Sequence, residues 1–223
     1  MNAAIAFFDV DGTIVKGDIV RHFVRLRTWD MHPMARRLWI ALFVLRLPFL
    51  LLLDAFSRAR FQRALYAGYR AVSPAELARR VPPYSARWIE PRIFPAAAAR
   101  IAHHRQQNHR VVLVTGSLAP IVAPLAARLQ ASAVLAPDLH RTGGAFTGAL
   151  DGEPLAGKRK AAAALQFASQ QGVAPADCFA YADSRDDLPL LESVGHAAVV
   201  NPGGRLRAVA ARRGWEILRW SVA

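Results

Sequence analysis

Four short apolar runs, each ending in polar residues, constrain the fold of this 223-residue chain more than any other feature. They cover residues 4–10, 111–116, 178–183 and 196–201, and helix-like segments lie between them. Apolar runs of about four to six residues that alternate with helices are typical of a parallel sheet covered on both faces. The sequence therefore predicts an α/β fold with a doubly wound parallel sheet.

The segment between the first two runs differs in composition. Residues 19–105 show little β signature and are rich in Arg, Ala and Leu, with prolines that would separate several helices. We predict a helical cap at 17–91, inserted into a core formed by 1–16 and 92–223. A smaller segment at 133–150 contains adjacent glycines between apolar runs, which indicates a hairpin.

The charge of the chain lies mainly in this middle segment. The chain has 29 Lys plus Arg against 16 Asp plus Glu, a formal net charge of +13. Residues 21–110 hold seventeen Arg, no Lys and four acidic residues, so the remainder is neutral. The excess charge therefore favours an anionic membrane or an anionic substrate at the cap. A nucleic-acid partner is not expected, because no nucleic-acid motif is present.

Cysteine content and the N-terminal residues bear on the compartment. Cys178 is the only cysteine, so it has no internal disulfide partner. The sequence MNAAIAFFDVDG has no basic residue before its apolar run and does not resemble a secretory signal. We expect a cytoplasmic protein, with the inner face of the cell membrane as a second location. The oligomeric state stays open.

The first cluster of polar residues follows the first apolar run. Asp9 and Asp11 are separated by one residue and are followed by Gly12. Two carboxylates at the end of a strand can face one small volume, where one can act as a nucleophile and the other as a general acid and base. The alternative is a solvated Asp-Gly turn.

Two further clusters suit a phosphoryl group. Thr115 and Gly116 end the second apolar run, where a hydroxyl and an N–H can bind phosphoryl oxygens, although the next residue is also an ordinary helix cap. Lys158 and Lys160 open a helix, and cations there are disfavoured unless an anion lies nearby.

The fourth cluster follows the third apolar run. It contains Asp183, Asp186 and Asp187, whose carboxylates suit a hard cation such as Mg²⁺ or could serve only as helix caps. Histidines at 103, 104 and 109 show no metal-ligand pattern and indicate a surface helix.

Taken together, the clusters resemble the haloacid dehalogenase superfamily of phosphohydrolases. FFDVDGT is similar to its first motif, VLVTGS to its second, GKRK to its third and YADSRDDLPLL to its fourth. The helical insertion after the first motif and the stretch 199–215 are similar to the phosphoserine-phosphatase-like branch, subfamily IB. The resemblance implies a Rossmann-like core and Mg²⁺-dependent hydrolysis of a phosphomonoester.

The resemblance also implies roles for individual residues. Asp9 would form an aspartyl-phosphate, and Asp11 would protonate the leaving oxygen and activate water. Mg²⁺ would be held by Asp9, the main-chain carbonyl of Asp11, and Asp183. Asp187 would support the metal shell or orient the lysine. The phosphoryl group would be bound by Gly12, Thr115, Gly116 and Lys160. Family spacing favours Lys160, although Lys158 could substitute, and Asp186 is left out of the metal site.

The cap contains an unusually apolar segment, residues 38–56, flanked by four arginines. From 38 to 53 only Arg46 and Pro48 interrupt it, and a helix of that length would be about 24 Å long, too short for a simple membrane span and broken by proline. The segment is either the buried core of the cap or an interfacial element on anionic lipid.

This segment and the threonine-glycine-serine of the second motif also resemble phosphatidylglycerophosphatases of the C type. That resemblance implies a phospholipid phosphomonoester as substrate. The rival is a soluble phosphatase for a small metabolite such as phosphoserine, to whose recognition Asp18 could contribute.

Overall fold

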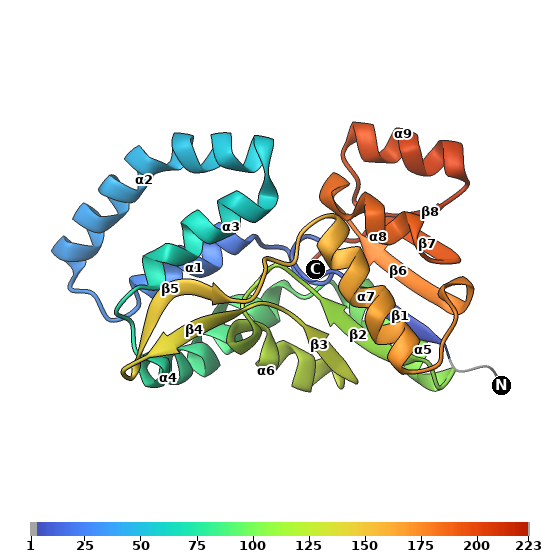
Figure 1. Cartoon of the computed structure of the whole chain (residues 1–223), viewed down its shortest axis with the longest axis horizontal. Coiled ribbons are helices and arrows are strands. Elements are labelled where there is room, and N and C mark those ends of the chain that lie inside the picture. The colour runs from blue at the N-terminus through green and yellow to red at the C-terminus, as the bar shows by residue number, and fades with distance from the viewer. Residues whose placement is uncertain (1–3, 223) are drawn as a thin grey trace.

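The computed structural model describes residues 4–222 and contains a six-stranded parallel sheet with the strand order β3-β2-β1-β6-β7-β8 (Figure 1). The prediction of a doubly wound parallel sheet is confirmed. The strands are β1 (Ile5–Phe8), β2 (Arg110–Val114), β3 (Ala133–Leu135), β6 (Cys178–Ala182), β7 (His196–Val200) and β8 (Glu216–Leu218). The last of these was not expected from the sequence, because its three residues are mostly exposed.

The central strand β1 is buried on both faces because its side chains alternate between two apolar layers. Ala6 and Phe8 belong to one layer, with residues of α5 (Pro95–Gln106) and α6 (Ala119–Leu129). Ile5 and Phe7 belong to the other, with residues of α7 (Lys158–Gln170), α8 (Leu188–Glu192) and α9 (Gly204–Arg213). Helices thus cover both faces, and the carboxyl ends of the parallel strands meet at one edge.

Between β1 and β2 the chain forms the predicted helical insertion. Its main helices are α1 (Ile19–Arg27), α2 (Pro33–Phe56), α3 (Arg58–Tyr66) and α4 (Pro74–Tyr84), followed by a π-helical turn, Ser85–Ile89. Pro33, Pro74 and Pro95 lie in the first turns of α2, α4 and α5, where a missing N–H costs nothing. The boundaries of the cap at 17 and 91 stay a prediction.

The hairpin lies where the paired glycines indicate, but it packs on the insertion. Strands β4 (Asp138–Thr142) and β5 (Ala145–Asp151) are antiparallel and are joined by two glycines with positive φ. The Phe146 N–H donates to the Val72 carbonyl at 2.9 Å, and the Ala71 N–H donates to the Phe146 carbonyl at 3.0 Å. Residues 133–135, expected to belong to the hairpin, instead form β3 at the edge of the sheet.

The apolar segment of the cap forms a longer helix than the sequence predicts. Helix α2 runs through Pro48 without a break for 24 residues, about 36 Å at the usual rise, so the expected termination at this proline is wrong. Proline removes only one hydrogen bond, and Figure 1 shows that α2 bends along its course. Its length and composition would allow it to cross a membrane.

The interpretation of α2 as buried cap core is also wrong for most of the helix. Leu50 is its one buried residue. Large apolar side chains at Met34, Leu38, Leu42, Val44, Leu45, Phe49, Leu51, Leu52 and Phe56 are each more than half exposed. Contact with the rest of the insertion comes from one side of the helix, where Trp39 and Phe43 stack on each other and lie against Phe23.

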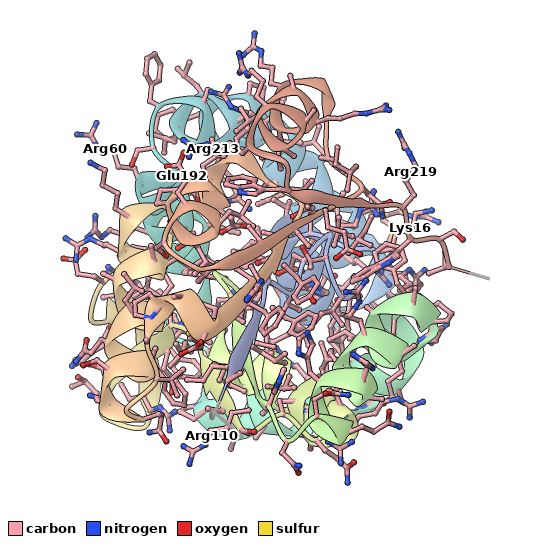
Figure 2. All side chains as sticks on the ribbon, turned by 90° about the vertical axis from the view of Figure 1, so that its right-hand side faces the viewer. Lys16, Arg60, Arg110, Glu192, Arg213 and Arg219 are labelled. Carbon is pink, nitrogen blue, oxygen red and sulfur yellow. The ribbon has the colours of Figure 1, made fainter. Side chains whose placement is uncertain are left out.

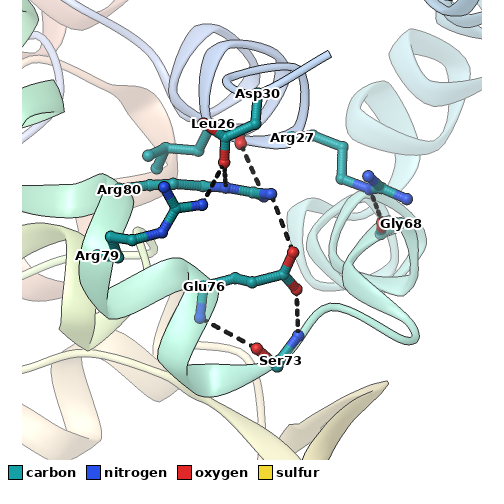
Figure 3. A network of polar contacts seen from close by, with 8 residues as sticks. All are labelled: Leu26, Arg27, Asp30, Gly68, Ser73, Glu76, Arg79 and Arg80. Carbon is teal, nitrogen blue, oxygen red and sulfur yellow. Dashed lines mark hydrogen bonds and ion pairs between the residues drawn. The ribbon is translucent and has the colours of Figure 1, made fainter.

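Arginine also builds the interior of the insertion. Arg80, whose side chain is 9% exposed, donates to Asp30 at 2.9 Å and to Glu76 at 3.2 Å (Figure 3). Its guanidinium additionally reaches the Leu26 carbonyl, and Arg79 donates to the same Asp30 carboxylate. This network joins α4 to α1 and to the loop that follows α1.

Elsewhere, basic side chains extend into solvent. Lys16, Arg60, Arg110 and Arg219 lie at the outline of the molecule in Figure 2, and Arg213 pairs with Glu192 at 2.6 Å. One histidine departs from the expected surface helix, because His104 is buried under the sheet and contacts the hydroxyl of Tyr181 at 2.9 Å.

Candidate active site

Lys160 connects the first, third and fourth sequence clusters. Its Nζ lies 2.6 Å from Asp9 Oδ1 and 2.7 Å from Asp187 Oδ1, and all three residues are buried. Helix α7 begins at Lys158, so the lysine two positions later faces the sheet edge while Lys158 is exposed. The structure thus places Lys160, the lysine that family spacing favours, beside the predicted nucleophile.

Three carboxylates gather around this lysine. One oxygen each from Asp9, Asp183 and Asp187 lies within 4.8 Å of the others. Thr13 Oγ1 donates to Asp183 Oδ1 at 3.4 Å. Oxygen donors from carboxylates are what a hard divalent cation requires, so the donor set fits Mg²⁺. Asp187, expected to support the metal shell or to orient the lysine, contacts Lys160 and also belongs to this group.

The negative charge of the cluster exceeds the positive charge of Lys160, and the pKa values reflect this. Burial, together with Asp187 and Asp183, raises the pKa of Asp9 well above its usual range, although Lys160 opposes the shift. Burial and the nearby Asp187 raise the pKa of Asp183 to about 6. For Lys160, burial alone would lower the pKa, but Asp187 and Asp9 outweigh it and raise the pKa. Excess buried negative charge of this kind indicates a cation site.

Gly12 allows the first and fourth clusters to approach each other. It has a φ of +89°, and a Cβ on this residue would lie 2.1 Å from Asp183 Oδ2. Only glycine combines that backbone conformation with such a close contact. Its N–H, expected to lie free for a phosphoryl oxygen, instead donates to the Val15 carbonyl at 2.8 Å. The structure therefore gives Gly12 a packing role in place of the expected donor role.

Two residues, His22 and Ser117, hydrogen-bond the Asp11 carboxylate, and the sequence predicted neither contact. His22 Nε2 lies 2.8 Å from Asp11 Oδ1, and the Ser117 hydroxyl donates to Asp11 Oδ2 at 2.6 Å. Burial would raise the pKa of Asp11, but His22 and the Ser117 hydrogen bond outweigh it and lower the pKa. His22 lies on α1 of the insertion and is itself buried, with Nδ1 2.5 Å from the Tyr84 hydroxyl. No spacing pattern in the sequence connects it to Asp11.

The second cluster lies at the end of β2, as predicted. Thr115 is buried, and its Oγ1 accepts a hydrogen bond from the Ser117 N–H at 3.0 Å. Gly116 packs closely against the insertion: a Cβ on this residue would lie 2.1 Å from Gln62 Nε2, and its carbonyl accepts from the Tyr66 hydroxyl at 2.8 Å.

A cavity of about 180 Å³ opens over these residues. Its core side includes Asp9, Asp11, Lys160 and Asp183, and its insertion side includes Asp18, Ile19, Arg58 and Gln62. Arg58 is held at 2.9 Å from both carboxylate oxygens of Asp54. The floor of the cavity therefore holds the carboxylates that the sequence predicts to be reactive, while the insertion supplies one acidic and one basic group, Asp18 and Arg58.

Comparison with known proteins agrees with this geometry. Residues 6–192 match the family of haloacid dehalogenase-like hydrolases. The chain therefore belongs to this family, and the prediction of an enzyme of this class is confirmed.

Individual relatives make the likeness more specific. The chain is 33% identical over 222 residues to phosphoserine phosphatase SerB1 of Mycobacterium tuberculosis, covering 99% of this chain and 72% of that protein. It is 26% identical over 172 residues to histidinol-phosphatase of Neisseria meningitidis, covering 75% of each.

Solved structures share the fold along almost the whole chain. A Bordetella pertussis protein described as of unknown function has a TM-score of 0.83 at 25% identity, covering 98% of this chain and 99% of that one. A substrate-bound phosphoserine phosphatase has a TM-score of 0.71 at 14% identity, covering 98% and 93%.

Proposed function

We propose that the chain is a phosphatase that hydrolyses phosphomonoesters through an aspartyl-phosphate on Asp9. The observation that carries this proposal is the contact of Asp9 with Lys160 in a cavity that also holds Asp11 and Asp183. A nucleophile, a second acid and a buried cation for the phosphoryl group are the parts that phosphoryl transfer through a covalent intermediate requires.

The proposed reaction has two displacements. Asp9 Oδ attacks phosphorus and the bond to the leaving oxygen breaks, while Asp11 donates its proton to that oxygen. Asp11 then accepts a proton from water, whose oxygen attacks the phosphorus of the aspartyl-phosphate and releases inorganic phosphate and the Asp9 carboxylate. Lys160 neutralises part of the charge on the phosphoryl oxygens, with Thr115 and Gly116 at the end of the neighbouring strand.

Mg²⁺ is the proposed cofactor. Asp9, Asp183 and Asp187 offer carboxylate oxygens, and Asp11 offers its main-chain carbonyl by resemblance to the family. When bound, Mg²⁺ supplies Lewis-acid stabilisation of negative charge on the phosphoryl oxygens.

The test of this proposal is turnover of p-nitrophenyl phosphate with Mg²⁺ by purified protein. We expect Asp9→Asn to abolish turnover, Asp11→Asn to reduce it severely, and removal of divalent cations by EDTA to stop it until Mg²⁺ is restored. Asp151→Asn, at an exposed position on β5, is the matched control. Full activity of Asp9→Asn would exclude the nucleophile assignment.

For the substrate, we propose a phospholipid phosphomonoester such as phosphatidylglycerophosphate, hydrolysed at the inner face of the cell membrane. The supporting observation is α2, which exposes apolar side chains along its entire length. Monomeric soluble proteins rarely expose an apolar surface of this extent unless it contacts a partner or a membrane. The headgroup would enter the cavity while the acyl chains stay outside it.

A lipid surface suits α2 better than a second copy of the chain. A helical seam between two copies needs a narrow apolar stripe with charged residues on either side. Here the exposed stripe at 38, 42, 45, 49, 52 and 56 is widened by Val44 and Leu51 instead of being bordered by charged residues. The single charged residue in the apolar run, Arg46, donates to the Ala64 carbonyl of α3. Apolar coverage flanked by arginines is typical of a helix in the interface of an anionic membrane.

The second candidate is a small phosphorylated metabolite such as phosphoserine. Asp18 and Arg58 line the same cavity and carry opposite charges, as an amine and a carboxylate on one substrate would require. Without lipid contact, α2 would be covered by another protein surface.

A substrate panel and vesicle flotation separate these candidates. We expect kcat/KM to be higher for phosphatidylglycerophosphate than for phosphoserine, and we expect flotation with vesicles to resist high salt. The double variant Leu38→Gln, Leu45→Gln should abolish flotation and leave p-nitrophenyl phosphate turnover unchanged, because both side chains point into solvent. Preference for phosphoserine with no flotation would contradict the lipid assignment.

A further inference from the structure

We propose that a second cavity, formed entirely by the insertion, binds the headgroup phosphate of an anionic phospholipid. The cavity has a volume of about 170 Å³ and is lined by Arg25, Trp29, Arg36, Arg87 and Trp88. None of these residues lines the active-site cavity. The inference rests on the membrane contact proposed above and deepens it by naming the group on the protein that recognises the lipid.

Three guanidinium groups converge on this cavity from three separate elements. Arg25 lies on α1, Arg36 in the first turns of α2, and Arg87 on the π-helical turn Ser85–Ile89. Arginine binds phosphate oxygens through a planar fork of N–H donors, and several such forks around one volume are typical of phosphate recognition. The cavity therefore combines the donors that an oxyanion requires.

Trp88 orients two of these arginines. The Arg25 Cζ atom lies 3.8 Å from the centre of a Trp88 ring, and the Arg87 Cζ atom lies 5.5 Å from it. Stacking uses the flat face of a guanidinium and leaves the N–H groups at its edge free for another partner. The tryptophan thus limits the motion of the cationic groups without occupying their hydrogen-bond donors.

The positive charge in this cavity is not neutralised within residues 4–222. The acidic residues on adjacent segments are engaged elsewhere: Asp30 binds Arg79 and Arg80, and Glu90 pairs with Arg128 at 3.1 Å. No ion pair involves the three cavity arginines in this described part of the chain. Like charges gathered around one volume repel each other, and an anion would remove that repulsion.

The position of Arg36 favours a lipid as the source of the anion. It lies on α2 between Met34 and Leu38, which are 69% and 64% exposed. Side chains two positions apart on a helix point to nearly opposite sides, so Arg36 faces the cavity while Met34 and Leu38 face solvent. With α2 resting on a membrane by its exposed side, a phosphate bound at this end of the helix would lie at the level of the lipid headgroups. A free phosphate would use the same arginines without requiring α2 to contact a membrane.

The test compares two triple variants that remove the same charge. The cavity variant removes the three cations of the cavity by the substitutions Arg25→Gln, Arg36→Gln and Arg87→Gln. The control variant removes three exposed arginines elsewhere by Arg105→Gln, Arg110→Gln and Arg207→Gln. Flotation uses vesicles of phosphatidylcholine alone and of an equimolar mixture with phosphatidylglycerol. We expect the cavity variant to bind the mixed vesicles roughly 10- to 100-fold more weakly than wild type, and the control variant to stay within about threefold.

The single variant Arg36→Gln gives a readout that does not depend on packing, because this exposed arginine does not stack on Trp88. It should weaken binding to mixed vesicles and leave binding to phosphatidylcholine vesicles and turnover of p-nitrophenyl phosphate unchanged. Equal losses in the two triple variants, or no loss in the cavity variant, would overturn the proposal. So would equal binding of wild type to neutral and mixed vesicles, a result that leaves the α2 contact intact.

A titration with inorganic phosphate distinguishes a lipid headgroup from a free phosphate as the anion that this cavity binds. If millimolar phosphate changes the tryptophan fluorescence of wild type but not of the cavity variant, while both bind mixed vesicles equally, the site takes a free oxyanion and the lipid assignment is overturned. Turnover of p-nitrophenyl phosphate is measured without vesicles throughout. Failure of catalysis therefore appears independently of failure at this cavity.

Discussion

His22 Nε2 lies 2.8 Å from Asp11 Oδ1, so a histidine from the insertion holds the carboxylate that is proposed to act as general acid and base. The other ring nitrogen contacts the hydroxyl of Tyr84, and Ser117 holds the second oxygen of Asp11 from the core side. The orientation of Asp11 therefore depends on both parts of the fold.

This contact predicts that loss of His22 affects substrates according to their leaving group. An alkyl phosphate needs a proton on its leaving oxygen, whereas p-nitrophenolate leaves without one. We expect His22→Ala to lower kcat for an alkyl phosphate by about 100-fold and for p-nitrophenyl phosphate by less than about tenfold. His22→Gln, which can still hydrogen-bond Asp11, should recover part of the loss. Equal losses on both substrates would indicate a merely structural role, and His140→Ala is the exposed control.

Lys160 and Lys158 provide a matched pair for the phosphate site. Lys160→Met removes the buried cation between Asp9 and Asp187 and should lower kcat/KM for p-nitrophenyl phosphate by more than about 100-fold. Lys158→Met, two positions earlier on the exposed side of the helix, should stay within about twofold of wild type. A reversed order would mean that Lys158 binds the phosphoryl group.

Gly12 and Gly152 both have positive φ, but only Gly12 contacts the site. Alanine at either position should cost about 1–2 kcal/mol in the free energy of unfolding because of the backbone conformation. In Gly12→Ala, the new Cβ also displaces Asp183, so phosphatase activity and Mg²⁺ affinity should fall, whereas Gly152→Ala should keep both. Urea unfolding, turnover and Mg²⁺ titration measure these effects, and intact Mg²⁺ affinity in Gly12→Ala would contradict the predicted displacement.

His104 predicts a pH dependence of stability. Burial, together with the neighbouring positive charge, lowers its pKa from 6.5 to about 4. As the pH falls, the unfolded chain binds the proton first, so stability that is complete above pH 6.5 is lost progressively down to about pH 4. We expect His104→Leu to reduce the loss in unfolding free energy between pH 7 and pH 5 by about 1–2 kcal/mol, measured by urea unfolding. His140→Leu should leave that loss as in wild type.

Arg80 and Arg79 allow the stability contributions of a buried and an exposed arginine in the insertion to be compared. Arg80→Met removes the hydrogen bonds to Asp30, Glu76 and Leu26 and should lower the free energy of unfolding by about 1–3 kcal/mol. Arg79→Met removes one contact of a side chain that is 66% exposed and should cost less than about 1 kcal/mol. Thermal unfolding of both variants measures which substitution costs more. A larger loss in Arg79→Met would mean that the exposed Arg79–Asp30 pair contributes more than the contacts of Arg80.

The core and its cluster of carboxylates could be predicted from the sequence for a local reason. Each strand is a short apolar run, and the residue that follows it must lie at the carboxyl edge of a parallel sheet. Asp9, Thr115 and Asp183 were therefore placed near one another by their positions after β1, β2 and β6. Strand β8 and the pairing of β3 with β2 could not be predicted, because strands of three residues at the edge of a sheet are too short to show a pattern.

The insertion could not be predicted in the same way. Its composition indicated helices, but a proline inside a helix removes one hydrogen bond and ends the helix only if packing does not compensate, so the passage of α2 through Pro48 depended on its neighbours. The burial of His104 and the exposure of Leu45 likewise could not be predicted from the sequence, because residue type sets only a preference for the interior or the surface.

The sequence by itself determined which polar residues follow each strand of the core, and it determined the charge of the cap. Only the tertiary structure decided that Lys160 lies between Asp9 and Asp187, that His22 holds Asp11, and that α2 remains uncovered. The physical reason is the range of the interactions. Strands, turns and helix caps arise from neighbouring residues, whereas contacts between residues far apart in the chain form only when packing fixes their distance and excludes water.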